Sequence, residues 1–89
     1  MNKIVYIISP NVYQDDISRQ LTKNGFGCTK IGSHGAYLNS GQTTMFVITS
    51  DDRVGEIHTI IRKIKGKKPV EHVPNIFVFM SDVHGTTSI

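Results

Sequence analysis

The sequence predicts one α+β domain, in which four antiparallel strands form a single sheet and two helices cover one of its faces. Its 89 residues suffice for a single small domain. Extended segments and amphipathic stretches follow one another in the order β-α-β-β-α-β. Right-handed crossovers then place both helices on the same face of the sheet.

The first strand is predicted at Lys3–Ser9, where five consecutive apolar residues, Ile4–Ile8, have no polar interruption. Such a run is typical of a strand that is covered on both faces, so we expect it at the centre of the sheet. Pro10 ends this strand, and Asn11 is expected to cap the helix that follows.

The first helix is predicted between Val12 and Asn24. Its buried stripe is formed by residues four positions apart, Tyr13, Ile17 and Leu21. Gly25 is suited to the position just after the helix, and Phe26 is expected to pack back onto it.

The next two strands are predicted at Gly27–Ser33 and Thr43–Thr49. The first alternates weakly, whereas the second reads TTMFVIT and is expected to be the other central strand. Between them, residues 32–44 contain three glycines, several hydroxyl side chains and Tyr37. This segment is either a plain hairpin connection or a loop shaped for a ligand, because closely approached glycine N–H groups and threonine hydroxyls suit an anion or a small polar molecule.

The second helix is predicted to open at Ser50–Asp52, with an acidic first turn. Its buried stripe consists of four aliphatic side chains at 3, 4, 3 spacing, Val54, Ile57, Ile61 and Ile64. We expect Gly66 to end this helix and Pro69 to prevent it from resuming. A polar connection over 67–74 then leads to the last strand at Asn75–Met80.

These elements predict a ferredoxin-like βαββαβ sandwich over residues 1–80, followed by a tail at 81–89. The formal charge of +3 and the isoelectric point near 9.2 favour anionic partners. Most of the excess comes from a cluster at the end of the second helix, Arg62, Lys63, Lys65, Lys67 and Lys68, for which a solvated helix end is the ordinary interpretation.

Cys28 is the only cysteine, which excludes an intrachain disulfide and a multi-cysteine zinc site and suits a reducing, cytoplasmic setting. No apolar run approaches the ~18 residues that span a bilayer, so no membrane insertion is expected. No nucleophile elbow or triad motif is present, and the four histidines lack metal-binding spacings. The third strand also lacks the aromatic pattern of RNA-recognition modules. We therefore expect no catalysis, no cofactor, no metal and no nucleic acid.

A longer motif that includes most of residues 32–44 points to a more specific function for this segment. Thr29-Lys30-Ile31, followed by the run from Gly35 to Thr44, resembles the PII-like cyclic di-AMP receptor proteins of Gram-positive bacteria. The likeness continues through Asp52-Arg53-Val54 and resumes at Ile76-Phe77-Val78, so that it covers roughly residues 3–65 and 75–80. The resemblance implies a PII-like homotrimer that holds a dinucleotide between its subunits and signals to a regulatory protein partner.

The resemblance also implies roles for individual residues. Thr29 would donate a hydrogen bond to the ligand, and Gln42 would stand where the family has an adenine-reading amide. Phe77 would pack on a base. The remaining ligand-binding residues would offer backbone and apolar contacts from the turn: Gly35, Ala36, Tyr37 and Leu38.

The chain departs from the family pattern at four places. Gly27 replaces a basic residue, Gln42 replaces an asparagine, and Ile48 replaces a glycine. The connection Gly66–Pro74 is also much shorter than the family's glycine-rich insertion.

A weaker resemblance joins Gly35-Ala36-Tyr37 and the ending Phe77–Val83 to the small cytosolic domain at the C-terminus of some bacterial multi-spanning membrane proteins. The sequence therefore predicts a PII-like signal-transduction protein that binds a small anionic nucleotide, with cyclic di-AMP as the first candidate. The alternative is a protein–protein interaction module whose pocket is vestigial or empty.

Overall fold

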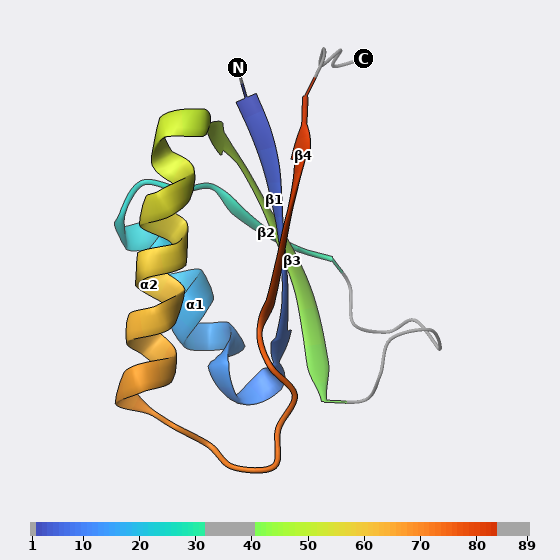
Figure 1. Ribbon diagram of the computed structural model, residues 1–89, viewed down its shortest axis with the longest axis vertical. Helices are drawn as coiled ribbons and strands as arrows, with labels where there is room; N and C mark the ends of the chain where they lie inside the picture. The colour runs from blue at the N-terminus through green and yellow to red at the C-terminus, as the bar shows by residue number, and fades with distance from the viewer. Residues whose placement is uncertain (1, 32–40, 84–89) are drawn as a thin grey trace.

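The computed structural model describes residues 2–31 and 41–83 (Figure 1). Its four strands are β1 (Asn2–Pro10), β2 (Cys28–Ile31), β3 (Gln42–Ser50) and β4 (Phe77–Asp82). Its helices are α1 (Asn11–Lys23), a 3-10 turn η1 (Asp51–Arg53) and α2 (Val54–Lys67). The strands form one antiparallel sheet in the order β2-β3-β1-β4. The predicted fold class is confirmed, and so are the two predicted central strands.

Both helices lie on the same side of the sheet, as Figure 1 shows edge-on. We call the side that they cover the closed face. There the alternate residues of the two central strands, Val5, Ile7, Met45 and Val47, have no exposed surface. They pack against the buried stripes that the sequence predicted, Tyr13, Ile17 and Leu21 from α1 and Val54, Ile57, Ile61 and Ile64 from α2. Together with Phe26, these side chains form the hydrophobic core of the described residues.

The end of α1 follows the prediction closely. Gly25 has a φ of +86°, a conformation that side chains other than glycine rarely adopt. Its N–H donates to the Thr22 carbonyl at 3.1 Å, and the Phe26 N–H donates to the Leu21 carbonyl at 2.9 Å. These two bonds form a Schellman motif, which satisfies carbonyls that the helix end leaves unpaired. Phe26 packs back as expected, and only 4% of its surface is exposed.

Three local predictions were wrong. Asn11 is not a cap, because α1 begins at Asn11 itself, and Pro10 at the N-cap position makes no side-chain cap bond. Gly66 does not end α2, which continues to Lys67. The last strand begins at Phe77 instead of Asn75 and continues to Asp82, since its backbone pairs with β1 as far as Lys3.

A buried tyrosine fixes the connection that follows α2. The Tyr13 hydroxyl donates a hydrogen bond to the Lys68 carbonyl at 2.8 Å and accepts one from the Val70 N–H at 3.1 Å. The tyrosine side chain itself has no exposed surface. Since one hydroxyl meets both backbone groups, α1 holds the start of the 68–76 connection in place.

Candidate functional site

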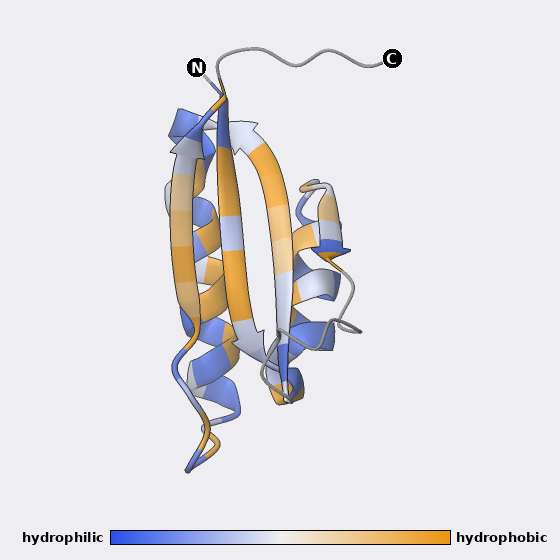
Figure 2. Ribbon diagram, turned by 90° about the vertical axis from the view of Figure 1, so that its right-hand side faces the viewer, coloured by the Kyte–Doolittle hydropathy of each residue, from blue (hydrophilic) through white to orange (hydrophobic). Residues whose placement is uncertain are grey.

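The sheet has a second side, which no helix covers. Residues directly opposite one another on antiparallel strands share a face. The register therefore places Tyr6 in one row with Phe46, Phe79 and Thr29, and Ile8 in the next row with Thr44, Phe77 and Ile31. We call this side the open face; its members are Ile4, Tyr6, Ile8, Thr29, Ile31, Gln42, Thr44, Phe46, Ile48, Phe77, Phe79 and Ser81. Figure 2 looks onto it, with hydrophobic residues along the middle of the three long strands.

Several large apolar side chains of the open face are accessible. The exposed fractions are 47% for Ile48, 47% for Phe77 and 52% for Phe79. The rings of Phe77 and Phe79 stack with centroids 6.3 Å apart and an angle of 17° between their planes. Tyr6 and Phe46 lie with centroids 6.4 Å apart. A surface of this kind can cover the flat apolar face of a heterocycle or the matching surface of another protein.

Thr29, Gln42 and Phe77 all lie on the open face, although they do not meet one another within one chain. Thr29 is exposed on β2, one edge strand, whereas Phe77 opens β4, the opposite edge strand. Three strand spacings separate the edges, roughly 14 Å. Gln42 is half-buried at the start of β3, opposite Pro10. The predicted Gly35, Ala36, Tyr37 and Leu38 lie outside the described residues.

The described chain resumes at Gly41, next to the start of α1. The Asn11 N–H donates to the Gly41 carbonyl at 2.7 Å, and the Thr43 hydroxyl donates to the Asn11 side-chain oxygen at 2.6 Å. Gly41 itself has a φ of +95°. Asn11 thus ties the return of the chain at residue 41 to the first turn of α1, a role that the capping prediction missed.

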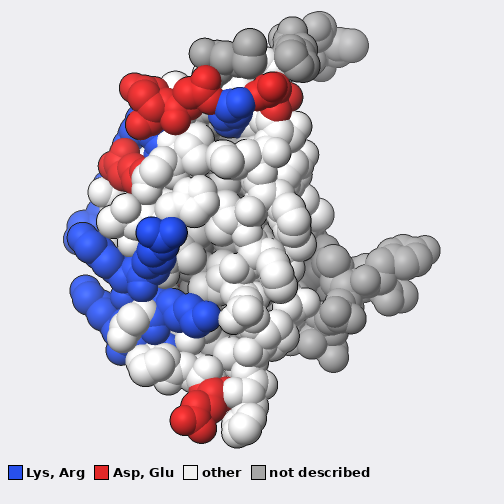
Figure 3. Space-filling model, in the orientation of Figure 1, with Lys and Arg blue, Asp and Glu red and all other residues white. Residues whose placement is uncertain are grey.

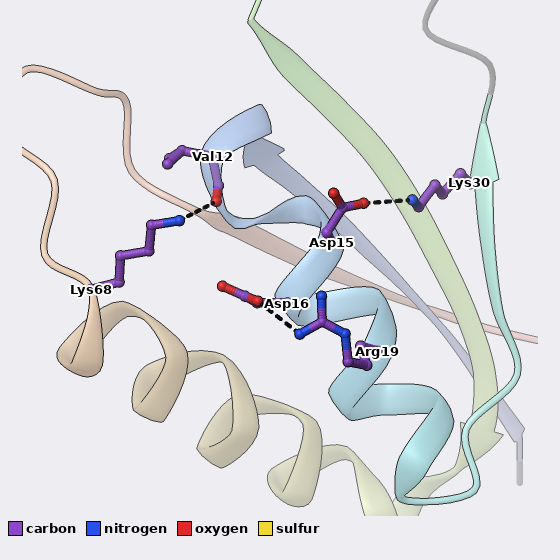
Figure 4. Close-up of polar contacts among 6 residues, drawn as sticks. All are labelled: Val12, Asp15, Asp16, Arg19, Lys30 and Lys68. Carbon is purple, nitrogen blue, oxygen red and sulfur yellow. Dashed lines mark hydrogen bonds and ion pairs between the residues drawn. The ribbon is translucent and has the colours of Figure 1, made fainter.

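Among the described residues, the open face carries no Lys or Arg side chain. Lys30 is the nearest cation in the sequence to Thr29, but it lies opposite Met45 and therefore points to the closed side. There its Nζ reaches the Asp15 carboxylate at 3.5 Å (Figure 4). An anion on the open face would thus depend on hydroxyl and backbone N–H donors from this part of the chain.

Cys28 is also on the closed side, opposite Val47. Partial burial raises the pKa of its thiol above the ordinary value, against a smaller lowering by the Ser18 hydroxyl. A thiol with a raised pKa stays protonated at neutral pH, which does not suit a nucleophile.

Neither a metal centre nor a membrane-spanning helix is found among the residues that the structure describes. No three His, Cys, Asp or Glu side chains there gather in a group that could hold a metal ion. No helix of residues 2–31 and 41–83 is long and apolar enough to cross a membrane.

Sequence reasoning missed Phe79 as a site residue. It stands beside Phe77 on the open face and is the most exposed aromatic residue there. Its signal was the alternation F-V-F in residues 77–79, which places both phenylalanines on one side of a strand.

Comparisons with known proteins agree on the fold. The family model described as cyclic-di-AMP receptor matches residues 1–85. No curated protein matches the chain. Among solved structures, a protein of unknown function from Pediococcus pentosaceus is 23% identical, with a TM-score of 0.76 over 99% of this chain and 97% of that one. CPII, a nitrogen regulatory PII-like protein from Thiomonas intermedia solved with ADP, AMP and bicarbonate, is 16% identical, with a TM-score of 0.70 over 99% and 96%.

Proposed function

The chain belongs to the cyclic-di-AMP receptor family, and we propose that it is a PII-like signalling protein that binds a cyclic dinucleotide between the subunits of a homotrimer. Cyclic di-AMP is the first candidate ligand. The observation that carries the proposal is the uncovered apolar face of the sheet, on which Thr29, Gln42 and Phe77 all lie. A receptor of this kind acts by binding, and no catalytic role is assigned to any residue.

The open face supports assembly. A sheet that is apolar on both sides needs a cover on both sides, and α1 and α2 supply only one. Ile48, Phe77 and Phe79 are about half exposed, which a monomer would leave in contact with water. Self-association of this face buries them at no cost in unpaired charge, because the described part of the face has no Lys or Arg.

The positions of Thr29 and Phe77 support a site between subunits. They occupy opposite edges of one chain's sheet, roughly 14 Å apart. Where the β2 edge of one subunit meets the β4 edge of the next, one subunit's threonine and the other's phenylalanine come together. The ligand's phosphate then takes the hydroxyl, and its base takes the ring. CPII, with the same fold, is known bound to ADP and AMP.

Two departures from the family predict weak binding. Gly27 directly precedes β2 and stands where the family has a basic residue, so a charge-assisted bond to phosphate is lost. Ile48 stands where the family has glycine, and its half-exposed side chain takes up space on the open face. We therefore expect this chain to hold its ligand less tightly than receptors with the full pattern.

Thermal melts and calorimetry test the proposal with cyclic di-AMP, other cyclic dinucleotides, ATP and AMP. Ligand at ~100 times its dissociation constant stabilises the folded state by about 2.7 kcal/mol, which a melt detects. Thr29→Val removes a hydrogen bond worth about 1.5–3 kcal/mol and should weaken binding about 10- to 150-fold. Thr22→Val, on the exposed side of α1, is the matched control and should leave binding unchanged.

Light scattering tests the assembly separately. A homotrimer has a mass near 30 kDa, three times the 9.9 kDa of the chain. A protein that stays at the monomer mass at micromolar concentration would refute the trimer and, with it, the site between subunits.

The second candidate function is a protein–protein interaction module with an empty pocket. The observation that favours it is Ile48, which fills part of the face where the family has only a glycine hydrogen. A trimer whose melting temperature does not change with any of the nucleotides at millimolar concentration would select this function over the first.

A further inference from the structure

The basic residues of the chain are divided between two different environments. Outside the end of α2, four of the five are in ion pairs with carboxylates: Lys3, Arg19, Lys30 and Arg53. The other five gather on the last turns of α2 and the residue after it, namely Arg62, Lys63, Lys65, Lys67 and Lys68. Within residues 2–31 and 41–83, none of these five is in a salt bridge. Figure 3 shows the resulting basic patch over α2, away from the acidic residues at the other end of the helix.

The patch borders a groove between the two helices. This groove has a volume of about 360 Å³ and takes Ile60, Lys63, Ile64 and Lys67 from successive turns of one side of α2. Residues 60, 63, 64 and 67 follow the 3, 4 spacing of a single helix face. Apolar side chains therefore lie beside two ammonium groups, which have no carboxylate partner in the described chain.

The opposite wall of the groove comes from α1 and is mostly polar and uncharged. It includes Gln20 and Asn24. The Asn24 side-chain amide donates one N–H to the Gln20 carbonyl at 2.7 Å, so the Asn24 side-chain oxygen and the Gln20 amide are the groups that can bond to a peptide backbone. Its one carboxylate, Asp16, is held by Arg19 at 3.2 Å (Figure 4). Lys68 closes one end, where its Nζ approaches the Val12 carbonyl at 3.5 Å.

We propose that this groove between α1 and α2 docks an acidic segment of a partner protein. Such a segment places carboxylates against Lys63 and Lys67, one apolar side chain against Ile60, and its backbone against the amides of α1. The proposal goes beyond nucleotide binding, because the groove is lined by residues of the two helices and of the chain directly after each of them. Figure 2 shows these helices on the other side of the sheet from the open face. The groove stays accessible when the open face is covered.

The chemistry of the groove favours a peptide over a nucleic acid. A phosphate backbone needs a continuous track of cations. Here Arg62 and Lys65 line a different groove, between α2 and β4, so the five cations are split between two sides of the helix.

Because the five basic residues lie on two sides of α2, the helix also offers a matched control for the test. Lys63→Glu with Lys67→Glu reverses two charges inside the groove, whereas Arg62→Glu with Lys65→Glu reverses two charges on the other side of the same helix. Both pairs are exposed, so both variants are expected to fold. Their melting curves and far-ultraviolet circular dichroism check this.

The probe is a short fluorescein-labelled peptide that alternates Glu and Leu, followed by fluorescence anisotropy at low salt. We expect Lys63→Glu/Lys67→Glu to weaken binding by roughly tenfold or more, and Arg62→Glu/Lys65→Glu to weaken it by less than about threefold. Amide shifts in the bound protein should map to α1 and to the side of α2 that carries residues 60, 63, 64 and 67.

Three results would overturn the proposal. The first is no binding of the peptide to the wild type, and the second is an equal loss in both double variants, which would indicate unspecific charge attraction. The third is tighter binding of an oligonucleotide or of phosphatidylserine vesicles than of the peptide. The rise in melting temperature that a nucleotide causes should be the same in Lys63→Glu/Lys67→Glu as in the wild type. Loss of peptide binding can therefore be distinguished from loss of nucleotide binding.

Discussion

The two faces of the sheet are built from the same strands and the same kinds of residue, yet helices of the chain cover only one of them. Ile7 and Ile8 are neighbours on β1; Ile7 has no exposed surface, while Ile8 remains partly exposed on the open face. On β3, Val47 is fully buried and Ile48 is 47% exposed. The difference between the faces lies in what covers them, because their apolar character is similar.

The open face is unusually apolar for a sheet face that no helix covers. A solvated sheet face normally alternates to polar residues, and here only a few stand near its margins: Thr29, Gln42, Thr44 and Ser81. The closed face supplies the folding energy, and the proposed function assigns the open face to a partner copy and a ligand. The helix layer carries the cluster of basic residues at the end of α2. The molecule therefore has a buried apolar layer, an accessible apolar face and a basic outer side.

The largest expected effect separates the two faces directly. Ile7→Ala empties a fully buried position and should lower the free energy of unfolding by about 2–5 kcal/mol. Ile8→Ala removes the same atoms from the open face and should cost clearly less in the monomer. Urea unfolding of both variants measures the difference. Equal losses at concentrations where the protein is a monomer would show that the open face is as well covered as the closed one.

The next largest effect is expected from the buried hydroxyl of Tyr13. Tyr13→Phe keeps the buried ring and removes the hydroxyl that serves both the Lys68 carbonyl and the Val70 N–H. We expect a loss of about 1–3 kcal/mol in the free energy of unfolding, since two backbone groups lose their partner. Tyr6→Phe is the control, because the Tyr6 ring stands on the open face. A loss no larger than that of the control would mean that water replaces the hydroxyl.

The elements and the strand order could be predicted because each depends on a local pattern. Buried stripes such as Tyr13, Ile17 and Leu21 need only helical periodicity, and the Gly25-Phe26 ending needs only a glycine at the right place. The errors depend on contacts distant in sequence. Asn11 is held by Thr43, and the length of β4 is set by pairing with β1, ending in the ion pair between Lys3 and Asp82.

The candidate site was less predictable from the residues alone. Thr29, Gln42 and Phe77 came from a family resemblance, and only the strand register reveals that all three share the open face. The hydrogen bond from Thr43 to Asn11 at the base of the predicted ligand segment has no sequence signal, because 32 residues separate its partners.

A smaller effect is expected from a substitution in the turn that ends α1. Gly25→Ala puts a side chain on a residue with a φ of +86° and should cost roughly 1–2 kcal/mol. Gly27→Ala, two residues further on, has no atom within 4 Å of the added carbon and no positive φ. Its effect should be close to zero. Thermal melts of the two variants compare them, and a stable Gly25→Ala protein would mean that the turn can rearrange.

The smallest change in folding free energy, and the most informative one about assembly, is expected at Ile48. Ile48→Lys places a charge on a half-exposed position of the open face, so the monomer should lose less than about 1 kcal/mol. A charge buried between subunits is far more costly, and assembly should therefore fail. Thr22→Lys adds the same charge on the exposed side of α1 and should leave the mass unchanged.

Mass and concentration dependence together decide this last prediction. Folding of an assembling protein is stabilised by mass action, so the melting temperature of the wild type should rise with protein concentration. That of Ile48→Lys should not, while its circular dichroism spectrum stays that of the folded domain. If Ile48→Lys keeps a trimer mass near 30 kDa, three chains of 9.9 kDa each, the subunits must meet elsewhere. The part of the open face around Ile48 would then stay uncovered in the assembled protein and remain free for the ligand.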